Sequence, residues 1–299
     1  MITRRNFLQT LAALSLAPAL AAQPAWHLNY MVASAMYGNL PLEEILAQVT
    51  RSGASSIDLW PKPHGTQREE LEAIGADKFA SMLRSHGIQL GGSTRYDLGP
   101  FRLEAELSAI KQLGGSIIVT GGAGNYKLTG EALKGEVKGF VEKLKPNAAK
   151  AAELGLTIAI ENHANNLIDS PDSLRWLTEM AVPGIGIALA PYHLPQDPLL
   201  LAALIRDLGP KLSLFYAWEH GLGCSKAMPK HEELQQLPGR GSLDWKPLLV
   251  ALKSIRFNGP TEIFMHPTPR GFPILETADK VTAEINRARA YLSAIEAQI

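Results

Sequence analysis

Half of the histidines in this chain stand at the ends of apolar runs. The chain has eight histidines, and His163, His193, His220 and His266 each follow a predicted strand. Glu161 precedes His163 by two positions, so the period-two geometry of a strand puts both side chains on one face. Carboxylates and imidazoles are the groups that most often move protons near neutral pH. We therefore take Glu161 and His193 as candidate catalytic residues and the other histidines as candidate substrate contacts.

Three more side chains near these histidines are candidates for substrate binding. Tyr216 and Trp218 alternate with His220 along one predicted strand face, and Arg270 follows His266 in the next loop. Aromatic faces can stack on a sugar ring. Core packing is the alternative for each aromatic residue, and a hydrogen bond to a loop carbonyl is the alternative for a single histidine. The clustering of all these residues favours a binding site.

The elements that must position these residues alternate between short β-rich runs and longer segments of helical periodicity. This alternation is typical of βα units with a parallel sheet. The predicted strands are Trp26–Ser34, Ser56–Pro61, Ile88–Thr94, Ser116–Thr120, Leu156–Glu161, Ile185–Ala190, Leu212–Trp218 and Thr261–His266. The predicted helices are Leu42–Arg51, Glu69–Ser85, Leu103–Leu113, Glu131–Glu153, Pro171–Met180, Pro198–Leu208, Leu243–Ile255 and Glu276–Ala297.

Eight βα units in one chain of this length predict an α/β fold, a single-domain (β/α)₈ TIM barrel. An open doubly wound sheet is the competing interpretation. Its glycine fingerprint is missing, because Gly122-Ala123-Gly124 lacks the third glycine at the required spacing. In a TIM barrel, the reactive groups come from the carboxyl ends of the strands and the loops that follow them. The candidate residues above all occupy such positions.

The first 21 residues have the pattern of an export signal. Arg4 and Arg5 precede an apolar run from Leu11 to Leu20, and a small-residue cleavage pattern ends at Ala21. The paired arginines resemble the twin-arginine (Tat) consensus, which implies the twin-arginine translocase as a partner during export. An amphipathic first helix or a membrane anchor is the alternative, but the run is shorter than the roughly 20 residues that span a bilayer. We expect residues 22–299 to form the mature barrel, exported to the periplasm or beyond and without a membrane span.

Composition narrows the possible partners. The chain has 29 basic and 29 acidic residues and one cysteine, Cys224. There is no basic surplus to neutralise a phosphate backbone, so nucleic acid is a poor candidate. One cysteine cannot form an internal disulfide or a multi-cysteine zinc site. A small-molecule carbohydrate is the expected partner, and Cys224 is expected to be an inert loop thiol.

Three segments together resemble the sugar phosphate isomerase/epimerase family, whose fold is a xylose-isomerase-like TIM barrel. They are Ile160-Glu161-Asn162-His163, Ser170-Pro171-Asp172-Ser173-Leu174 and Pro238-Gly239-Arg240-Gly241-Ser242-Leu243-Asp244-Trp245. The resemblance implies one divalent metal held by a Glu, an Asp, a His and a Glu from strands five to eight, with the two glutamates moving a proton. Glu161 matches the first ligand and acid/base group. His193 matches a substrate-contacting histidine.

The other three ligand positions depart from that family. Ala190 occupies the position of the Asp, Tyr216 that of the His and Phe264 that of the final Glu. His220 lies further along the same predicted strand face as Tyr216. A hard divalent ion needs several oxygen ligands, which Glu161 alone cannot supply. Either Glu161 and the histidines form a rebuilt site for a transition metal, or the metal is lost. We favour loss of the divalent metal site that is usual in that family, and the sequence does not identify a cofactor.

Three functions remain compatible with these residues. The leading hypothesis is an exported isomerase- or epimerase-like protein that acts on a sugar, keto-sugar or oxidised sugar by proton transfer, with Glu161 as the acid/base residue. The second is a catalytically silent barrel that binds a carbohydrate or a partner protein, suggested by Ala190, Tyr216 and Phe264. The third and weakest is a glycoside lyase or hydrolase in which Glu161 and Glu219 or Glu262 flank the scissile bond.

Overall fold

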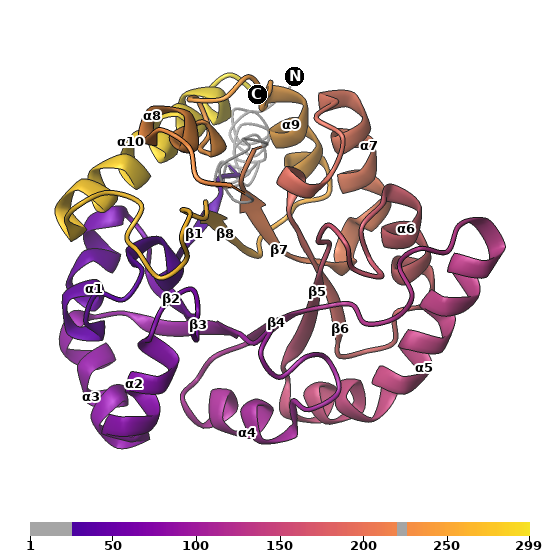
Figure 1. The fold of residues 1–299 in the computed structure, drawn as a ribbon, viewed down its shortest axis with the longest axis horizontal. Coiled ribbons are helices and arrows are strands. Elements are labelled where there is room, and N and C mark those ends of the chain that lie inside the picture. The colour runs from indigo at the N-terminus through magenta and orange to yellow at the C-terminus, as the bar shows by residue number, and fades with distance from the viewer. Residues whose placement is uncertain (1–25, 220–225) are drawn as a thin grey trace, which may run out of the picture.

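The chain folds into a closed barrel of eight parallel strands surrounded by helices (Figure 1). A computed structural model describes residues 26–219 and 226–299. The strands are β1 (Asn29–Ala33), β2 (Ser56–Leu59), β3 (Gln89–Thr94), β4 (Ile117–Gly121), β5 (Thr157–Glu161), β6 (Ile185–Leu189), β7 (Leu212–Ala217) and β8 (Pro260–Ile263). Pairing of β1 with β8 closes the sheet, so the predicted TIM barrel is confirmed and the open doubly wound sheet is wrong.

The helices form the outer layer of the barrel (Figure 1). They are α1 (Leu42–Val49), α2 (Gln67–Ile74), α3 (Ala76–His86), α4 (Glu104–Gln112), α5 (Gly130–Leu154), α6 (Pro171–Met180), α7 (Pro198–Leu208), α8 (Lys230–Glu233), α9 (Lys246–Ser254) and α10 (Ala278–Glu296). The region predicted as one helix over 69–85 is two helices, because Gly75 adopts a positive φ of 84° between them. None of the described helices combines the length and apolar character needed to cross a bilayer.

Local sequence signals set several helix ends. Ser170 caps α6 through its side chain, which accepts a hydrogen bond from the Ser173 amide, and Pro171 occupies the first helical turn. Asp197 caps α7 in the same way. Gly155 ends α5 in the left-handed conformation with φ of 68°, which only glycine adopts without strain. These stops let each strand begin where its apolar run begins.

Both faces of the strands are buried, one against the helices and one inside the barrel. β4 and β6 are buried at every position. Most side chains along the strands are aliphatic, as expected for a packed barrel interior. Toward the carboxyl ends of the strands the interior changes to carboxyls, hydroxyls and aromatic rings, and this change marks the functional end of the barrel.

Candidate active site

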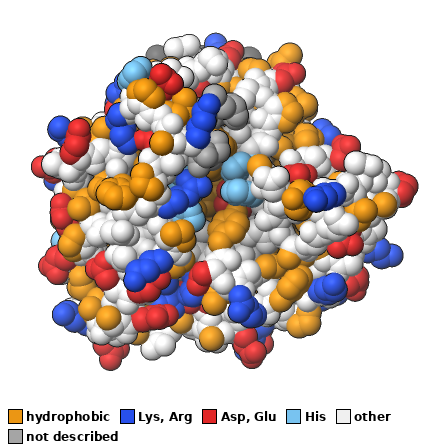
Figure 2. Space-filling model, in the orientation of Figure 1, with side chains coloured by type: hydrophobic (Ala, Val, Ile, Leu, Met, Phe, Trp, Pro, Cys, Tyr) orange, Lys and Arg blue, Asp and Glu red, His pale blue; other side chains and the backbone are white. Residues whose placement is uncertain are grey.

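Two adjoining cavities open at the carboxyl ends of the strands. One has a volume of about 230 Å³ and is lined by residues that include Glu161, His163 and Arg270. The other, about 240 Å³, shares Trp60, His64 and Tyr96 with the first. Both are smaller than the roughly 300–1,000 Å³ of pockets for drug-sized ligands, so we expect a small molecule as the occupant. Figure 2 shows histidine and basic side chains around a hollow in the middle of this face.

Glu161 ends β5 and supplies a buried carboxyl to this site. It is only 3% exposed, and burial is the main reason that its pKa rises to about 8. The hydroxyls of Tyr96 and Tyr216 oppose this effect by stabilising the ionised form, while Asp58 adds to it. Burial also raises the pKa of Tyr96 and of Tyr216 well above the usual value. At neutral pH, the predominant form of Glu161 is therefore a neutral carboxylic acid flanked by two protonated phenols.

Two more carboxyls, those of Asp58 and Glu262, belong to the same group. Both are fully buried, and each has at least one carboxyl oxygen without a hydrogen-bond partner among the described residues. Glu161 and Asp58 both raise the pKa of Glu262, after burial itself, and burial raises the pKa of Asp58 to about 7. Strands β2, β5 and β8 are not neighbours in the sheet, so these side chains meet inside the barrel.

The sequence interpretation missed Asp58, and it named Glu262 only as a glycosidase alternative. Each stands alone inside an apolar strand whose two faces are both buried, so neither belongs to a polar pattern. A charged residue in the middle of a predicted buried strand was the available signal. Thr94 donates a hydrogen bond of 2.6 Å to one Asp58 oxygen, which leaves the other oxygen facing the shared interior.

An aromatic layer covers these carboxyls on the side of the cavities. Phe264 lies two positions beyond Glu262, and its ring stacks on Trp60 at 5.2 Å between centroids. The Phe264 ring also lies 5.1 Å from each of the rings of Tyr216 and Trp218. The phenyl ring at the position of a glutamate in the resembled family therefore fills the barrel end with apolar volume.

Three of the predicted histidines, together with His64, form two close pairs around this layer. The rings of His163 and His193 are 4.0 Å apart, and those of His64 and His266 are 4.5 Å apart and stacked. His163 Nδ1 lies 2.8 Å from the Ala164 carbonyl oxygen. A carbonyl oxygen only accepts, so Nδ1 carries the proton and Nε2 is left as an acceptor.

Burial keeps the imidazoles of His64, His163 and His266 neutral. It lowers the pKa of His64 to about 4, with further contributions from Arg270 and His163. It also lowers the pKa of His163 and, well below the usual value, that of His266. Gln236 donates a hydrogen bond of 3.0 Å to the His266 carbonyl oxygen and accepts one from the Trp218 indole at 2.9 Å. Two of the predicted contact residues are thus held by one side chain.

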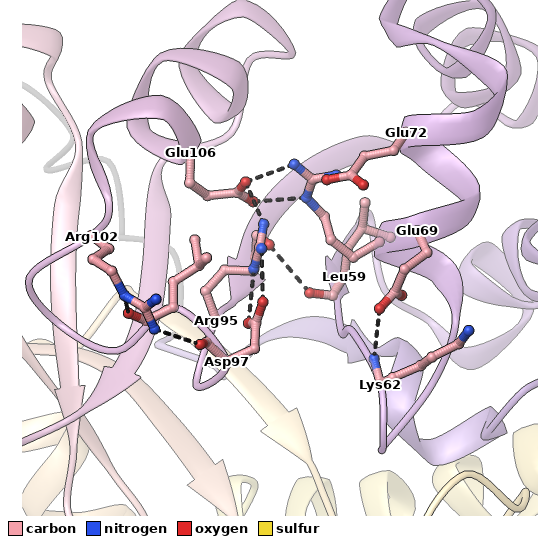
Figure 3. A network of polar contacts seen from close by, with 11 residues as sticks. Leu59, Lys62, Glu69, Glu72, Arg95, Asp97, Arg102 and Glu106 are labelled. Carbon is pink, nitrogen blue, oxygen red and sulfur yellow. Dashed lines mark hydrogen bonds and ion pairs between the residues drawn. The ribbon is translucent and has the colours of Figure 1, made fainter.

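A network of ion pairs fixes the loop that carries Tyr96 (Figure 3). Arg95 and Asp97, on either side of Tyr96, form two hydrogen bonds of 3.0 and 2.8 Å. Arg95 also binds Glu106 of α4, and Glu106 in turn accepts two hydrogen bonds from Arg68 of α2. Arg95 is therefore committed to this network.

The remaining predicted residues have different places. Arg270 and His266 line the cavity that contains Glu161 and His163. Trp218 stacks on Tyr192 with 4.1 Å between ring centroids and lies 5.0 Å from the His193 ring. The predictions for His220 and Cys224 lie outside the described residues, as does the leader over 1–21.

Glu219 has a structural role. Its carboxylate accepts hydrogen bonds from the Leu243 amide at 2.9 Å and the Trp245 indole at 3.0 Å. These contacts anchor the loop before α9. Both carboxylate oxygens of Glu219 thus accept hydrogen bonds from the protein, whereas the second catalytic carboxylate of a glycosidase has to be available to the substrate.

The residues at the expected ligand positions do not fit the metal centre that the resemblance implies. Ala190 and Phe264 carry no donor atom, and the Tyr216 hydroxyl is held protonated by burial. In residues 26–219 and 226–299, no three His, Cys, Asp or Glu side chains converge so as to hold a metal ion. Asp58, Glu161 and Glu262 share the barrel interior without forming such a group.

A larger cavity lies elsewhere, on the outside of the barrel. Its volume is about 530 Å³, and it runs along α5 beside the end of α6, where Lys134, Lys138 and Met180 are among its lining residues. It contains none of the strand-end residues. Because a TIM barrel presents its chemistry at the strand ends, we assign the site to the two smaller cavities.

Together, a closed parallel barrel and polar groups gathered at its carboxyl end define a protein of the TIM-barrel class. The chain belongs to the xylose isomerase-like TIM barrel family, whose model matches residues 46–286. This finding confirms the xylose-isomerase-like TIM barrel that the sequence resemblance implies. Comparison with curated protein sequences gives no match.

Solved structures with the same fold include sugar epimerases. A D-psicose 3-epimerase from Clostridium cellulolyticum H10, in a structure with D-tagatose, has a TM-score of 0.67 and 17% identity over 90% of this chain and 99% of that one. An L-ribulose 3-epimerase has a TM-score of 0.66 and 14% identity over 91% and 95%. The probable 3-DHS dehydratase AsbF of Bacillus anthracis has a TM-score of 0.63 and 15% identity over 86% and 97%. These identities establish a common fold.

Proposed function

We propose that this protein is a sugar isomerase or epimerase that moves a proton at a carbon next to a carbonyl group. The observation that carries the proposal is the Glu161 carboxyl, buried in a small cavity with a pKa of about 8. A carboxylic acid whose pKa lies near the working pH suits general acid catalysis. The epimerases among the structures of similar fold support the same class of reaction.

In the proposed reaction, Glu161 and His193 form the acid/base pair. The His193 imidazole removes the carbon-bound proton, and Glu161 donates its own proton to the carbonyl oxygen, so that the substrate becomes a neutral enediol. As the carbonyl re-forms, the Glu161 carboxylate takes back a hydroxyl proton of the enediol. Transfer of the proton from His193 to the neighbouring carbon gives isomerisation. Protonation of the first carbon on its opposite face by solvent, with release of the His193 proton to solvent, gives epimerisation. The protonated hydroxyls of Tyr96 and Tyr216 stabilise negative charge that develops on the oxygen.

We further propose that the metal site is altered relative to the resembled family. Ala190, Tyr216 and Phe264 support this proposal, because they offer no carboxylate or imidazole at three of four positions. The neutral carboxyl of Glu161 and the phenols of Tyr96 and Tyr216 then supply the electrostatic stabilisation of the substrate oxygen. We derive no step through a metal.

Proton exchange in D₂O tests the reaction. With a panel of ketoses, aldoses and sugar acids, we expect deuterium to enter the carbon next to the carbonyl of at least one compound, as followed by NMR. Glu161→Gln should lower the exchange rate at least 100-fold, since general acid/base groups contribute about 10²–10⁴-fold. Glu131→Gln, an exposed position on α5, is the matched control. Exchange that is absent throughout the panel, or equal in both variants, contradicts the proposal.

A binding barrel without turnover is the second candidate, and the Phe264 ring supports it. A phenyl group at this position closes the barrel end with apolar contacts to Trp60 and Trp218. In the experiment above, tight binding of a sugar without deuterium uptake would identify this second function.

We also propose export of the mature protein to the periplasm through the twin-arginine translocase. Arg4, Arg5 and the apolar run that follows them support this proposal. The expected N-terminus of the exported protein is Ala22 or a residue within a few positions of it, which mass spectrometry of the secreted fraction measures. Retention of Met1 in that fraction would contradict cleavage.

A further inference from the structure

Arg270 is a cationic group of the cavity that has no anionic partner in the protein. All aspartates and glutamates of the chain lie within residues 26–219 and 226–299, and none of them forms an ion pair with Arg270. One of its terminal nitrogens, Nη1, is buried without a hydrogen-bond partner in these residues. By contrast, Arg68 and Arg95 both form ion pairs with Glu106.

The surroundings of Arg270 provide no compensating charge. Arg270 acts on His64, His163 and His266 strongly enough to lower the pKa of each, so its positive charge reaches both histidine pairs. Glu161, which lines the same cavity, is mostly neutral at pH 7. Arg270 as a whole is half-buried, but its Nη1 is buried, and an anion that pairs with this nitrogen supplies the partner that the described residues do not.

We propose that Arg270 binds a carboxylate of the substrate, so that the ligand is a sugar acid or keto-sugar acid and not a neutral sugar. This inference rests on the proposed function and specifies its substrate class. A guanidinium matches a planar carboxylate through two parallel hydrogen bonds. Arg270 and Glu161 line one cavity of about 230 Å³, so a single small molecule reaches both groups.

The geometry favours a carboxylate over a phosphate. A phosphate group carries about two negative charges, and TIM barrels that bind it use loop amides at a helix N-terminus. Here one guanidinium and neutral imidazoles surround the cavity, and Lys62 lines only the neighbouring one. A single negative charge matches this arrangement.

Binding of matched sugar pairs tests the inference without requiring turnover. The probes are 2-keto-D-gluconate with D-fructose, D-galacturonate with D-galactose, and D-glucuronate with D-glucose, measured by calorimetry on the mature protein. We expect at least one acid to bind 10- to 100-fold more tightly than its neutral counterpart, the range that a hydrogen-bonded charged pair provides. Arg270→Gln should abolish that preference, and Arg270→Lys should retain part of it.

Arg206→Gln on α7 removes one positive charge far from the cavity and is the control. Circular dichroism confirms that each variant is folded. Equal binding of acid and neutral sugar, no binding of any of the three acids, or a preference that survives Arg270→Gln overturns the inference. So does tighter binding of D-fructose 6-phosphate than of every acid. Arg270-dependent acid binding without deuterium exchange supports the inference while contradicting the proposed function, so the two failures are distinguishable.

Discussion

At the scale of single residues, Tyr96 controls how readily Glu161 loses its proton. The Tyr96 hydroxyl stabilises the ionised carboxyl and lowers its pKa, against the larger effect of burial. If Glu161 acts as the acid, exchange activity must fall as the pH rises through about 8. Without the Tyr96 hydroxyl, one of the groups that lower the pKa of Glu161 is gone. The effect of burial then raises this pKa further.

We therefore predict that Tyr96→Phe moves the alkaline limb of the pH–rate profile upward by about one pH unit, the size of one hydrogen bond to a charged group. The measurement is deuterium exchange between pH 6 and 10 for the substrate found with the unmodified protein. Tyr291→Phe, at a partly exposed position on α10, should leave the limb in place. A downward movement in Tyr96→Phe would show that the hydroxyl favours the protonated acid instead.

Residue-level prediction from sequence succeeded where a strand end gave the side chains a direction. Glu161 is the last residue of β5, and His163, two positions beyond it, lines the same cavity, as the alternation of side chains along a strand predicts. Asp58 was missed and Tyr96 was not considered, for different reasons. Asp58 is an isolated charge in a strand buried on both faces, and Tyr96 lies in a loop whose path depends on distant ion pairs.

At the scale of elements, Glu106 joins two helices to the loop that presents Tyr96. It is 3% exposed on α4 and binds the guanidinium groups of both Arg68 and Arg95. Removal of the Glu106 carboxylate leaves the largely buried guanidinium groups of Arg68 and Arg95 without this ion-pair partner. Breaking a buried ion pair by removing one partner costs about 3–5 kcal/mol, because the other charge stays buried.

We predict that Glu106→Ala lowers the free energy of unfolding by about 3 kcal/mol or more. Urea unfolding followed by circular dichroism measures this value. Glu153→Ala, which removes the exposed partner of Lys150 on α5, should cost less than about 1 kcal/mol. Equal costs for the two variants would mean that the network of Figure 3 adds no more than a surface pair.

The positions of the strands and helices were predictable because the apolar runs that form them, and the caps and glycines that end them, are features of the local sequence. All eight predicted strands are present, and their ends differ from the prediction by no more than three residues. The predicted β1 began at Trp26, but the strand begins at Asn29, and the Trp26 indole instead donates a hydrogen bond to the Phe257 carbonyl oxygen. Such a tertiary contact has no signature in the local sequence.

At the scale of the whole molecule, the carboxyls in the barrel interior couple stability to pH. Asp58 has a pKa of about 7 and Glu161 of about 8 in the folded protein, against ordinary values of 3.8 and 4.5. Burial also raises the pKa of Glu262 well above its ordinary value. The folded state therefore holds protons that the unfolded chain releases above about pH 4.5. Stability must fall as the pH rises from there toward 8, by about 1.4 kcal/mol for each unit of pKa difference.

Glu262→Gln removes one of these titrating groups and keeps nearly the same shape. Because burial keeps Glu262 protonated and therefore neutral in the folded protein, the substitution removes the stability loss linked to Glu262 and leaves the charge of the barrel interior unchanged. We predict that the melting temperature of the variant falls less between pH 5 and 8 than that of the unmodified protein, leaving it roughly 5 °C or more higher at pH 8, since 1 kcal/mol corresponds to about 2–4 °C. Scanning calorimetry measures both curves, with Glu131→Gln as the exposed control. Parallel curves would mean that Glu262 is ionised and satisfied in the folded barrel, and the interior would then have to supply a cation.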